Sequence, residues 1–178
     1  DPLWSRGLGD VYKRQAETVQ QNFSQLNELM SASPEADRIA DLRLWTLREH
    51  ERLSPVFRER LAKGYVREGH GDLHLGNIVF IDGALTAFDC IDFSDGLRWG
   101  DVMSDVAFLF MDLLDRGAPQ LAWTFLDRYL EESGDFAGLT VLPYYVVYRA
   151  LVRAKIHLIR AQQAEAVPTG KPRLMAAF

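Results

Sequence analysis

The chain has 178 residues, of which 48% are hydrophobic and 11% aromatic, and this composition predicts one globular domain with a packed core. A disordered or collagen-like chain is excluded, because apolar residues are too many and glycine and proline too few. The 25 Asp and Glu residues outnumber the 20 Lys and Arg residues, and the net charge of -5 argues against nucleic-acid binding. No run of apolar residues is long enough for a membrane span, so we expect no membrane contact.

Cys90 is the only cysteine of the sequence, so an internal disulfide bond is excluded. This cysteine usage fits a reducing cytoplasm, where we expect the protein to reside. We expect Cys90 itself to be a small buried apolar side chain.

The first fifteen residues are interpreted as a sequencing artefact. The run DVYKRQ at residues 10–15 resembles the translation of a sequencing adapter, which would place a cut in the gene at about Ala16. Residues 1–15 are therefore left out of the fold prediction.

Two helices are predicted next. Apolar residues recur at three- and four-residue steps between residues 16 and 30, and a second helical pattern extends from Pro34 to Gly64. Because proline removes a backbone donor, Pro55 predicts a kink or a restart inside the second helix.

Extended segments follow these helices. Residues 65–68 form a short extended candidate, and residues 70–77 a polar loop. The β-branched run at 78–81, the Asp82-Gly83 turn signal and the apolar run at 85–91 predict a β-hairpin directly after that loop.

Helices return in the last part of the chain, with predicted ranges 102–114, 119–132 and 143–164. Residues 165–178 show no periodicity and are predicted to be a loose tail. The sequence therefore predicts an α+β, mostly helical fold.

The last helix carries three arginines, Arg149, Arg153 and Arg160. We expect them on a solvated or ion-paired face, with substrate contact as the second interpretation.

The polar loop carries the residues suited to chemistry. It has the sequence HGDLHLGN, with Asp72 and Asn77 five residues apart, as are the base Asp and the magnesium-binding Asn of protein-kinase catalytic loops. The hairpin then leads to Asp89 and Asp92, where a second carboxylate ligand is required, and Mg²⁺ prefers such oxygen ligands. We expect Asp72, Asp89 and Asp92 to converge at a magnesium site.

Three ordered blocks carry a family resemblance: residues 70–77, the IDFSD block at 91–95, and residues 100–107 with Gly100-Asp101 and Asp105-Val106-Ala107. Together they resemble the aminoglycoside phosphotransferase family, the small-molecule branch of the protein-kinase-like fold. Residues 67–113 look, more narrowly, like a bacterial subgroup often fused to a C-terminal P-loop ATP-binding domain. The resemblance extends over residues 16–164.

The resemblance implies the C-terminal lobe of a kinase-like fold and ATP-dependent phosphoryl transfer to a hydroxyl of a small molecule. Asp72 would accept or orient the proton of that hydroxyl, and Asn77 would hold Mg²⁺. Asp92 matches the family's Ile-Asp-Phe, whereas Asp89 fits the hairpin length better, so both remain candidates for the other metal ligand. The resemblance assigns His70 and Asp105 to structural support of the loop, and His74 is expected to support it by hydrogen bonds within the loop rather than to bind metal.

Parts of the ATP site are not found in the sequence. A glycine-rich phosphate cover and a strand lysine are missing, and the family carries them on an N-terminal lobe. The chain is therefore expected to be inactive alone and to need that lobe, and a fused P-loop domain after Phe178 could also have been lost. No residue pattern indicates which acceptor is used.

Two other classes of function remain open. His70, Asp72 and His74 form a His-x-Asp-x-His pattern that could bind a transition metal with Asp89 or Asp92 in a metal-dependent hydrolase, although the lack of further suitably placed histidines argues against it. A helical interaction module without catalysis is the third hypothesis.

Overall fold

The computed structural model describes residues 11–31 and 33–166. It is mostly helical with two small antiparallel sheets, which confirms the predicted α+β, mostly helical class. The elements are α2 (Val11–Leu29), α3 (Ala36–Ala62), β1 (Val66–Glu68), η1 (Leu75–Asn77), β2 (Ile78–Ile81), β3 (Ala84–Ala87), α4 (Asp95–Arg98), β4 (Trp99–Asp101), α5 (Val102–Asp115), α6 (Pro119–Ser133), η2 (Phe136–Thr140) and α7 (Leu142–Ala166).

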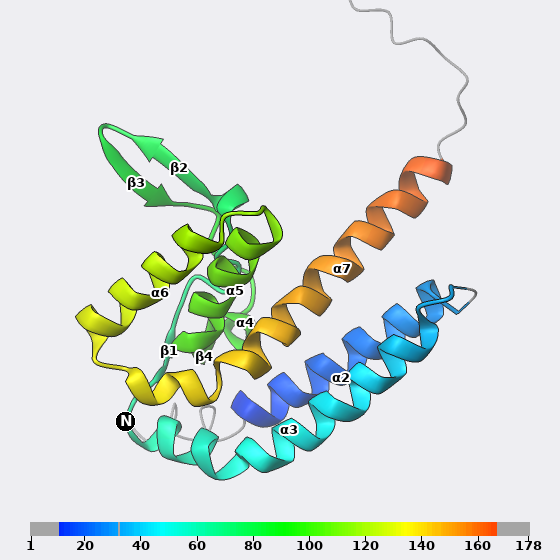
Figure 1. Ribbon diagram of the computed structural model, residues 1–178, viewed down its shortest axis with the longest axis horizontal. Coiled ribbons are helices and arrows are strands. Elements are labelled where there is room, and N and C mark those ends of the chain that lie inside the picture. The colour runs from blue at the N-terminus through cyan, green and yellow to red at the C-terminus, as the bar shows by residue number, and fades with distance from the viewer. Residues whose placement is uncertain (1–10, 32, 167–178) are drawn as a thin grey trace, which may run out of the picture.

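Helix α5 lies at the centre of the fold. It packs against α6 on one side and α7 on the other, and α7 in turn contacts the antiparallel pair α2 and α3 (Figure 1). Nearly every residue from Met103 to Leu113 is buried, as expected for a helix that is apolar on all sides. None of the helices within the described ranges has the length and apolar character needed to cross a membrane.

The predicted hairpin is confirmed, with Ile78 opposite Ala87 and Ile81 opposite Ala84. Asp82 and Gly83 form its turn, and both have positive φ angles, as a two-residue hairpin turn of the primed types requires. Figure 1 shows the β2–β3 hairpin projecting from the helical body. The other sheet joins β1 to β4, with Val66 opposite Asp101. The sequence did not predict β4, because a three-residue strand has no periodicity and forms only through its distant partner.

The first helix begins five residues earlier than predicted, at Val11 rather than Ala16. Val11 and Tyr12 are buried in the core, and the Tyr12 hydroxyl donates a 3.0 Å hydrogen bond to Asp101. Residues 11–15 thus pack with the domain, while their origin in an adapter remains a prediction. Residues 1–10, and most of the predicted tail (167–178), lie outside the described residues.

Helix α3 continues through Pro55, so the predicted restart does not occur. Leu53 and Phe57, two residues to either side, are buried in the core, and their packing holds the helix across the missing backbone donor. Figure 1 shows the helix bending toward its C-terminal end.

A buried ion network ties the end of α3 to the start of α5. The Arg60 guanidinium donates to Asp101 at 2.7 and 2.8 Å and to Asp135 at 2.8 Å through two of its nitrogens. Asp101 also caps α5, because its side chain accepts a hydrogen bond from the Met103 N–H. Burial, together with the nearby Asp101 carboxylate, raises the pKa of Tyr12 well above its usual value, so this hydroxyl remains a donor.

Candidate active site

Two carboxylates of helix α5 hold the polar loop in place. Asp105 accepts hydrogen bonds from the backbone N–H groups of His70 (2.8 Å) and Gly71 (3.1 Å). Asp112 is fully buried and accepts from the N–H of Leu75 at 2.9 Å. Because residues seven apart lie on the same face of a helix, α5 supports the loop at both ends. The buried apolar helix therefore fixes the backbone around Asp72.

Gly71 is required by this backbone. Its φ angle is +79°, and a Cβ atom at this position would lie 3.0 Å from the Ile91 side chain and 3.1 Å from the Leu97 carbonyl oxygen. Residues 88–91 also form hydrogen bonds with the loop. The Phe88 N–H donates to the Asn77 carbonyl, and the Ile91 N–H donates to the His70 carbonyl.

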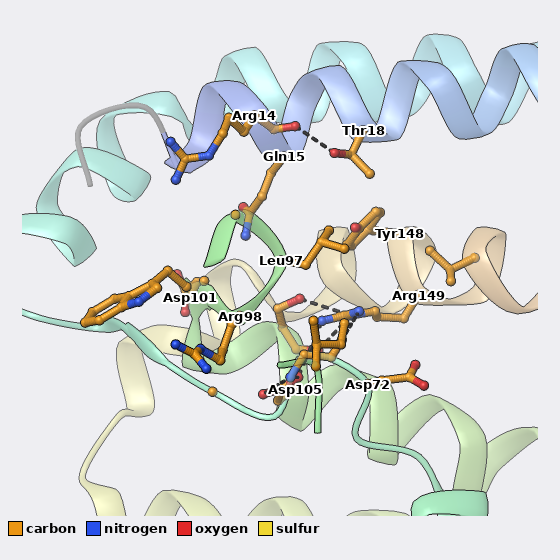
Figure 2. A pocket seen from close by; sticks show the side chains of 18 of the residues that line it. Arg14, Gln15, Thr18, Asp72, Leu97, Arg98, Asp101, Asp105, Tyr148 and Arg149 are labelled. Carbon is orange, nitrogen blue, oxygen red and sulfur yellow. Dashed lines mark hydrogen bonds and ion pairs between the residues drawn. The ribbon is translucent and has the colours of Figure 1, made fainter. Parts of the chain in front are cut away.

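Arg149 of α7 bonds both to the loop and to α5. Its guanidinium donates to the Gly71 carbonyl at 2.9 Å and to the Ser104 hydroxyl at 3.1 Å, and it lies 3.4 Å from an oxygen of Asp105. Figure 2 shows Arg149 reaching toward Asp105, with Asp72 nearby. The expectation of an ion-paired arginine holds for Arg149, but the side chain is buried rather than solvated.

The two loop histidines are engaged in local hydrogen bonds. The Nδ1 atom of His70 accepts from the Asp72 N–H, so its Nε2 carries the proton and donates to the Phe88 carbonyl at 2.9 Å. The Nδ1 atom of His74 accepts from the Gly76 N–H, and its Nε2 lies 3.5 Å from Asp72 Oδ2. Burial lowers the pKa of His74, which favours this neutral form. Since both Nδ1 atoms accept N–H groups and both Nε2 atoms carry protons, neither ring is free to bind a transition metal.

Asp72 and Asn77 form a direct pair. The Asn77 amide donates to Asp72 Oδ2 at 3.2 Å and to the Asp72 carbonyl at 3.0 Å. The Asp72 side chain remains 40% exposed, whereas Asn77 is buried. With its amide nitrogen fixed by these two bonds, Asn77 keeps Oδ1 free of any hydrogen bond from the described residues. Asp72 is therefore an accessible carboxylate held in one orientation by its neighbour.

Asp89 and Asp92 lie on the segment that bonds to the loop, but both are exposed and no hydrogen bond or ion pair from the described residues holds their carboxylates. Asp89 has a left-handed φ of +59°. Among residues 11–31 and 33–166, no three His, Cys, Asp or Glu side chains form a group that could hold a metal ion. The predicted convergence of Asp72, Asp89 and Asp92 is therefore not observed, because the backbone around 88–94 is irregular and exposed.

The same exposure corrects the prediction for Cys90, which is exposed rather than buried. The segment 79–90 is exposed throughout, because the hairpin projects from the helical body. Its exposed large apolar side chains include Phe80, Leu85 and Phe88, and Phe93 follows at 81% exposure.

The chemistry of the side chains beside the loop is compatible with Mg²⁺, which prefers oxygen ligands. Mg²⁺ is held by one or two protein oxygen ligands, with phosphate and water supplying the rest. The Oδ1 atom of Asn77, which accepts no hydrogen bond from the described residues, is an oxygen of the kind that Mg²⁺ prefers, as are the exposed carboxylates of Asp89 and Asp92.

A cavity of about 360 Å³ opens beside Asp72. It lies between α2, the loop, the 91–102 segment, α5 and α7 (Figure 2). Asp72, Arg149 and Lys155 are among its lining residues, so Asp72 lies at the edge of a space large enough for a small molecule.

Comparison with known proteins identifies the family. The profile of the phosphotransferase enzyme family matches residues 3–142, so the chain belongs to this family. Uncharacterized proteins of Mycobacterium tuberculosis and Mycobacterium bovis are each 39% identical to it over 121 residues, which is 68% of this chain and 23% of the relative. The chain thus spans about a quarter of the length of these curated relatives. No solved structure matches it significantly.

Two residues that support the loop were missed as such by the sequence analysis. Asp112 interrupts an otherwise apolar helix seven residues after Asp105, and this spacing was the available signal. Arg149 was noticed only as part of an arginine-containing face, and nothing local distinguishes it from Arg153 or Arg160.

Proposed function

We propose that the chain is the C-terminal catalytic lobe of an ATP-dependent, Mg²⁺-requiring kinase that phosphorylates a hydroxyl of a small molecule. The observation that carries the proposal is Asp72, an accessible carboxylate fixed by Asn77 at the edge of a cavity of small-molecule size. Membership of the phosphotransferase family supports the reaction class. The fold would then be the C-terminal lobe of a kinase-like enzyme.

In this mechanism Asp72 accepts the proton of the acceptor hydroxyl as that oxygen attacks the terminal phosphate of ATP. Its exposed oxygens can face the cavity, while the Asn77 amide fixes the carboxylate plane. Asn77 Oδ1 and the carboxylate of Asp92 or Asp89 would hold Mg²⁺, which supplies neutralisation of the phosphate charge. Asp105 and Arg149 act through the backbone of Gly71, whose N–H and carbonyl they respectively bind.

The isolated chain is expected to transfer no phosphate, because it needs a second lobe to bind ATP. The β2–β3 hairpin and the segment after it expose large apolar side chains beside the loop, Leu85 at 77% and Phe93 at 81%. Such surface in a soluble domain commonly marks a contact with another protein element. The family's ATP-gripping lobe is a suitable occupant, since the matched relatives are about four times longer than the aligned region.

The test compares the 178-residue chain with its full-length parent. Each is incubated with γ-labelled ATP, Mg²⁺ and a low-molecular-mass extract of the source bacterium, and labelled products other than phosphate are separated. The parent is expected to label a small molecule, and the isolated chain is expected to give little or no product. Ordinary turnover by the isolated chain would contradict the requirement for a second lobe. A parent that labels nothing would contradict the kinase assignment.

A further inference from the structure

A lysine and a buried asparagine meet in the same cavity, away from the catalytic loop. Lys155 of α7 donates a 2.6 Å hydrogen bond to Oδ1 of Asn22 on α2, and both residues line the same cavity as Asp72. Asn22 is only 2% exposed, and its Nδ2 is buried without an acceptor among the described residues. Burying an N–H group without an acceptor costs free energy of folding. The unpaired Nδ2 of Asn22 therefore indicates a position where a ligand could accept a hydrogen bond.

Lys155 has no anionic partner within the described part of the chain, unlike Arg98 and Arg149, which also line the cavity. Arg98 pairs with Glu68 and Asp95, and Arg149 pairs with Asp105. Within the described residues, the hydrogen-bond partner of Lys155 is the neutral amide of Asn22. Burial lowers the pKa of Lys155, so an anion placed beside it would offset the desolvation of the ammonium group.

The helix geometry relates this lysine to the catalytic loop. Arg149, Val152 and Lys155 recur at three-residue steps along α7 and all line the cavity. At 1.5 Å per residue, Lys155 lies about 9 Å along the helix axis from Arg149. Arg149 bonds to the carbonyl of Gly71, the residue before Asp72. The lining of the cavity therefore includes both the Asp72 carboxylate and a lysine without an anionic partner among the described residues.

We propose that Lys155 and Asn22 form an anion-binding subsite for the acceptor, which is a small hydroxylated molecule carrying a carboxylate or another anionic group. The assignment of its hydroxyl to Asp72 rests on the proposed function, whereas the anion subsite stands on the cavity alone. A polycationic acceptor such as an amino sugar is disfavoured, because it would place like charge against Lys155.

Three polyols with the same six-carbon skeleton test the subsite: gluconate, sorbitol and 1-amino-1-deoxysorbitol, whose terminal groups are anionic, neutral and cationic. Each is titrated into the ¹⁵N-labelled 178-residue chain without nucleotide, and amide shifts near Asn22 and Lys155 are followed. Gluconate is expected to bind, with the neutral and cationic analogues roughly tenfold weaker or worse. Lys155→Gln should weaken gluconate binding roughly tenfold, Lys155→Arg should restore most of it, and the matched exposed variant Lys63→Gln should leave it unchanged.

Failure of gluconate to bind, equal binding of all three polyols, or unchanged gluconate binding to Lys155→Gln would each overturn the subsite. Since the titration contains no ATP, it is independent of the phosphoryl-transfer assay. If gluconate binds in a Lys155-dependent way but the full-length parent transfers no phosphate, the kinase function is refuted and the subsite is not. If the parent transfers phosphate but the chain does not bind gluconate, the subsite is refuted and the kinase function is not.

Discussion

Replacing Arg60 with methionine tests the buried ion network that joins α3 to the site-bearing helix α5. The guanidinium side chain is 3% exposed, and both partner carboxylates, Asp101 and Asp135, are fully buried. Arg60→Met keeps the aliphatic stem but leaves two carboxylates facing each other without their shared cation. Tyr12 and the Met103 N–H still bond to Asp101, so the side chain is not entirely orphaned.

Breaking a buried ion pair by removing one partner costs roughly 3–5 kcal/mol. The free energy of unfolding of a domain is only about 5–15 kcal/mol, so the variant should lose a large share of its stability. Urea unfolding followed by far-ultraviolet circular dichroism measures this loss at neutral pH. Arg58→Met, two residues earlier on the same helix and exposed, serves as the control and should change stability by less than about 0.5 kcal/mol. A loss below about 1 kcal/mol for Arg60→Met would refute the reasoning.

Three further predictions concern the loop and the histidines. Asp105→Ala should speed amide hydrogen exchange at His70 and Gly71 by roughly tenfold or more, because both N–H groups lose their acceptor, while the exposed Asp115→Ala should not. Gly71→Ala should cost roughly 2 kcal/mol or more, against about 1 kcal/mol for Gly83→Ala, since both have positive φ but only Gly71 also lacks space for a Cβ; equal losses would contradict the steric account. Burial lowers the pKa of His50 and His74, so the unfolded chain binds more protons near pH 6 and the free energy of unfolding should fall between about pH 7 and pH 5. His50→Gln should flatten this dependence, and an unchanged slope would count against it.

Local patterns predicted most of the elements but few of the contacts between them. The helices from residue 102 onward appear within two residues of the predicted bounds, because hydrophobic periodicity and helix-starting prolines are local signals. The Asp82-Gly83 turn was found for the same reason. β4 was missed because it exists only through pairing with β1, and Cys90 was misjudged because its apolar surroundings belong to a projecting hairpin.

The site shows the same division between local and distant information. The spacing of Asp72 and Asn77 indicated a pair, and the structure brings the two side chains into contact. Asp112, Arg149 and Lys155 act on the loop or the cavity from 37 to 133 residues away in the chain, and their partners could not be read from their own surroundings in the sequence.

Replacement of Asp72 by asparagine in the full-length parent tests the central claim most directly. The variant keeps the size of the side chain and its bond to Asn77 through an acceptor oxygen, but it loses the basic carboxylate. Transfer of labelled phosphate from ATP to the acceptor should fall by roughly 10²–10⁴-fold, while the matched turn variant Asp82→Asn should keep the wild-type rate. A full transfer rate in Asp72→Asn would contradict the assignment of Asp72 as the catalytic base.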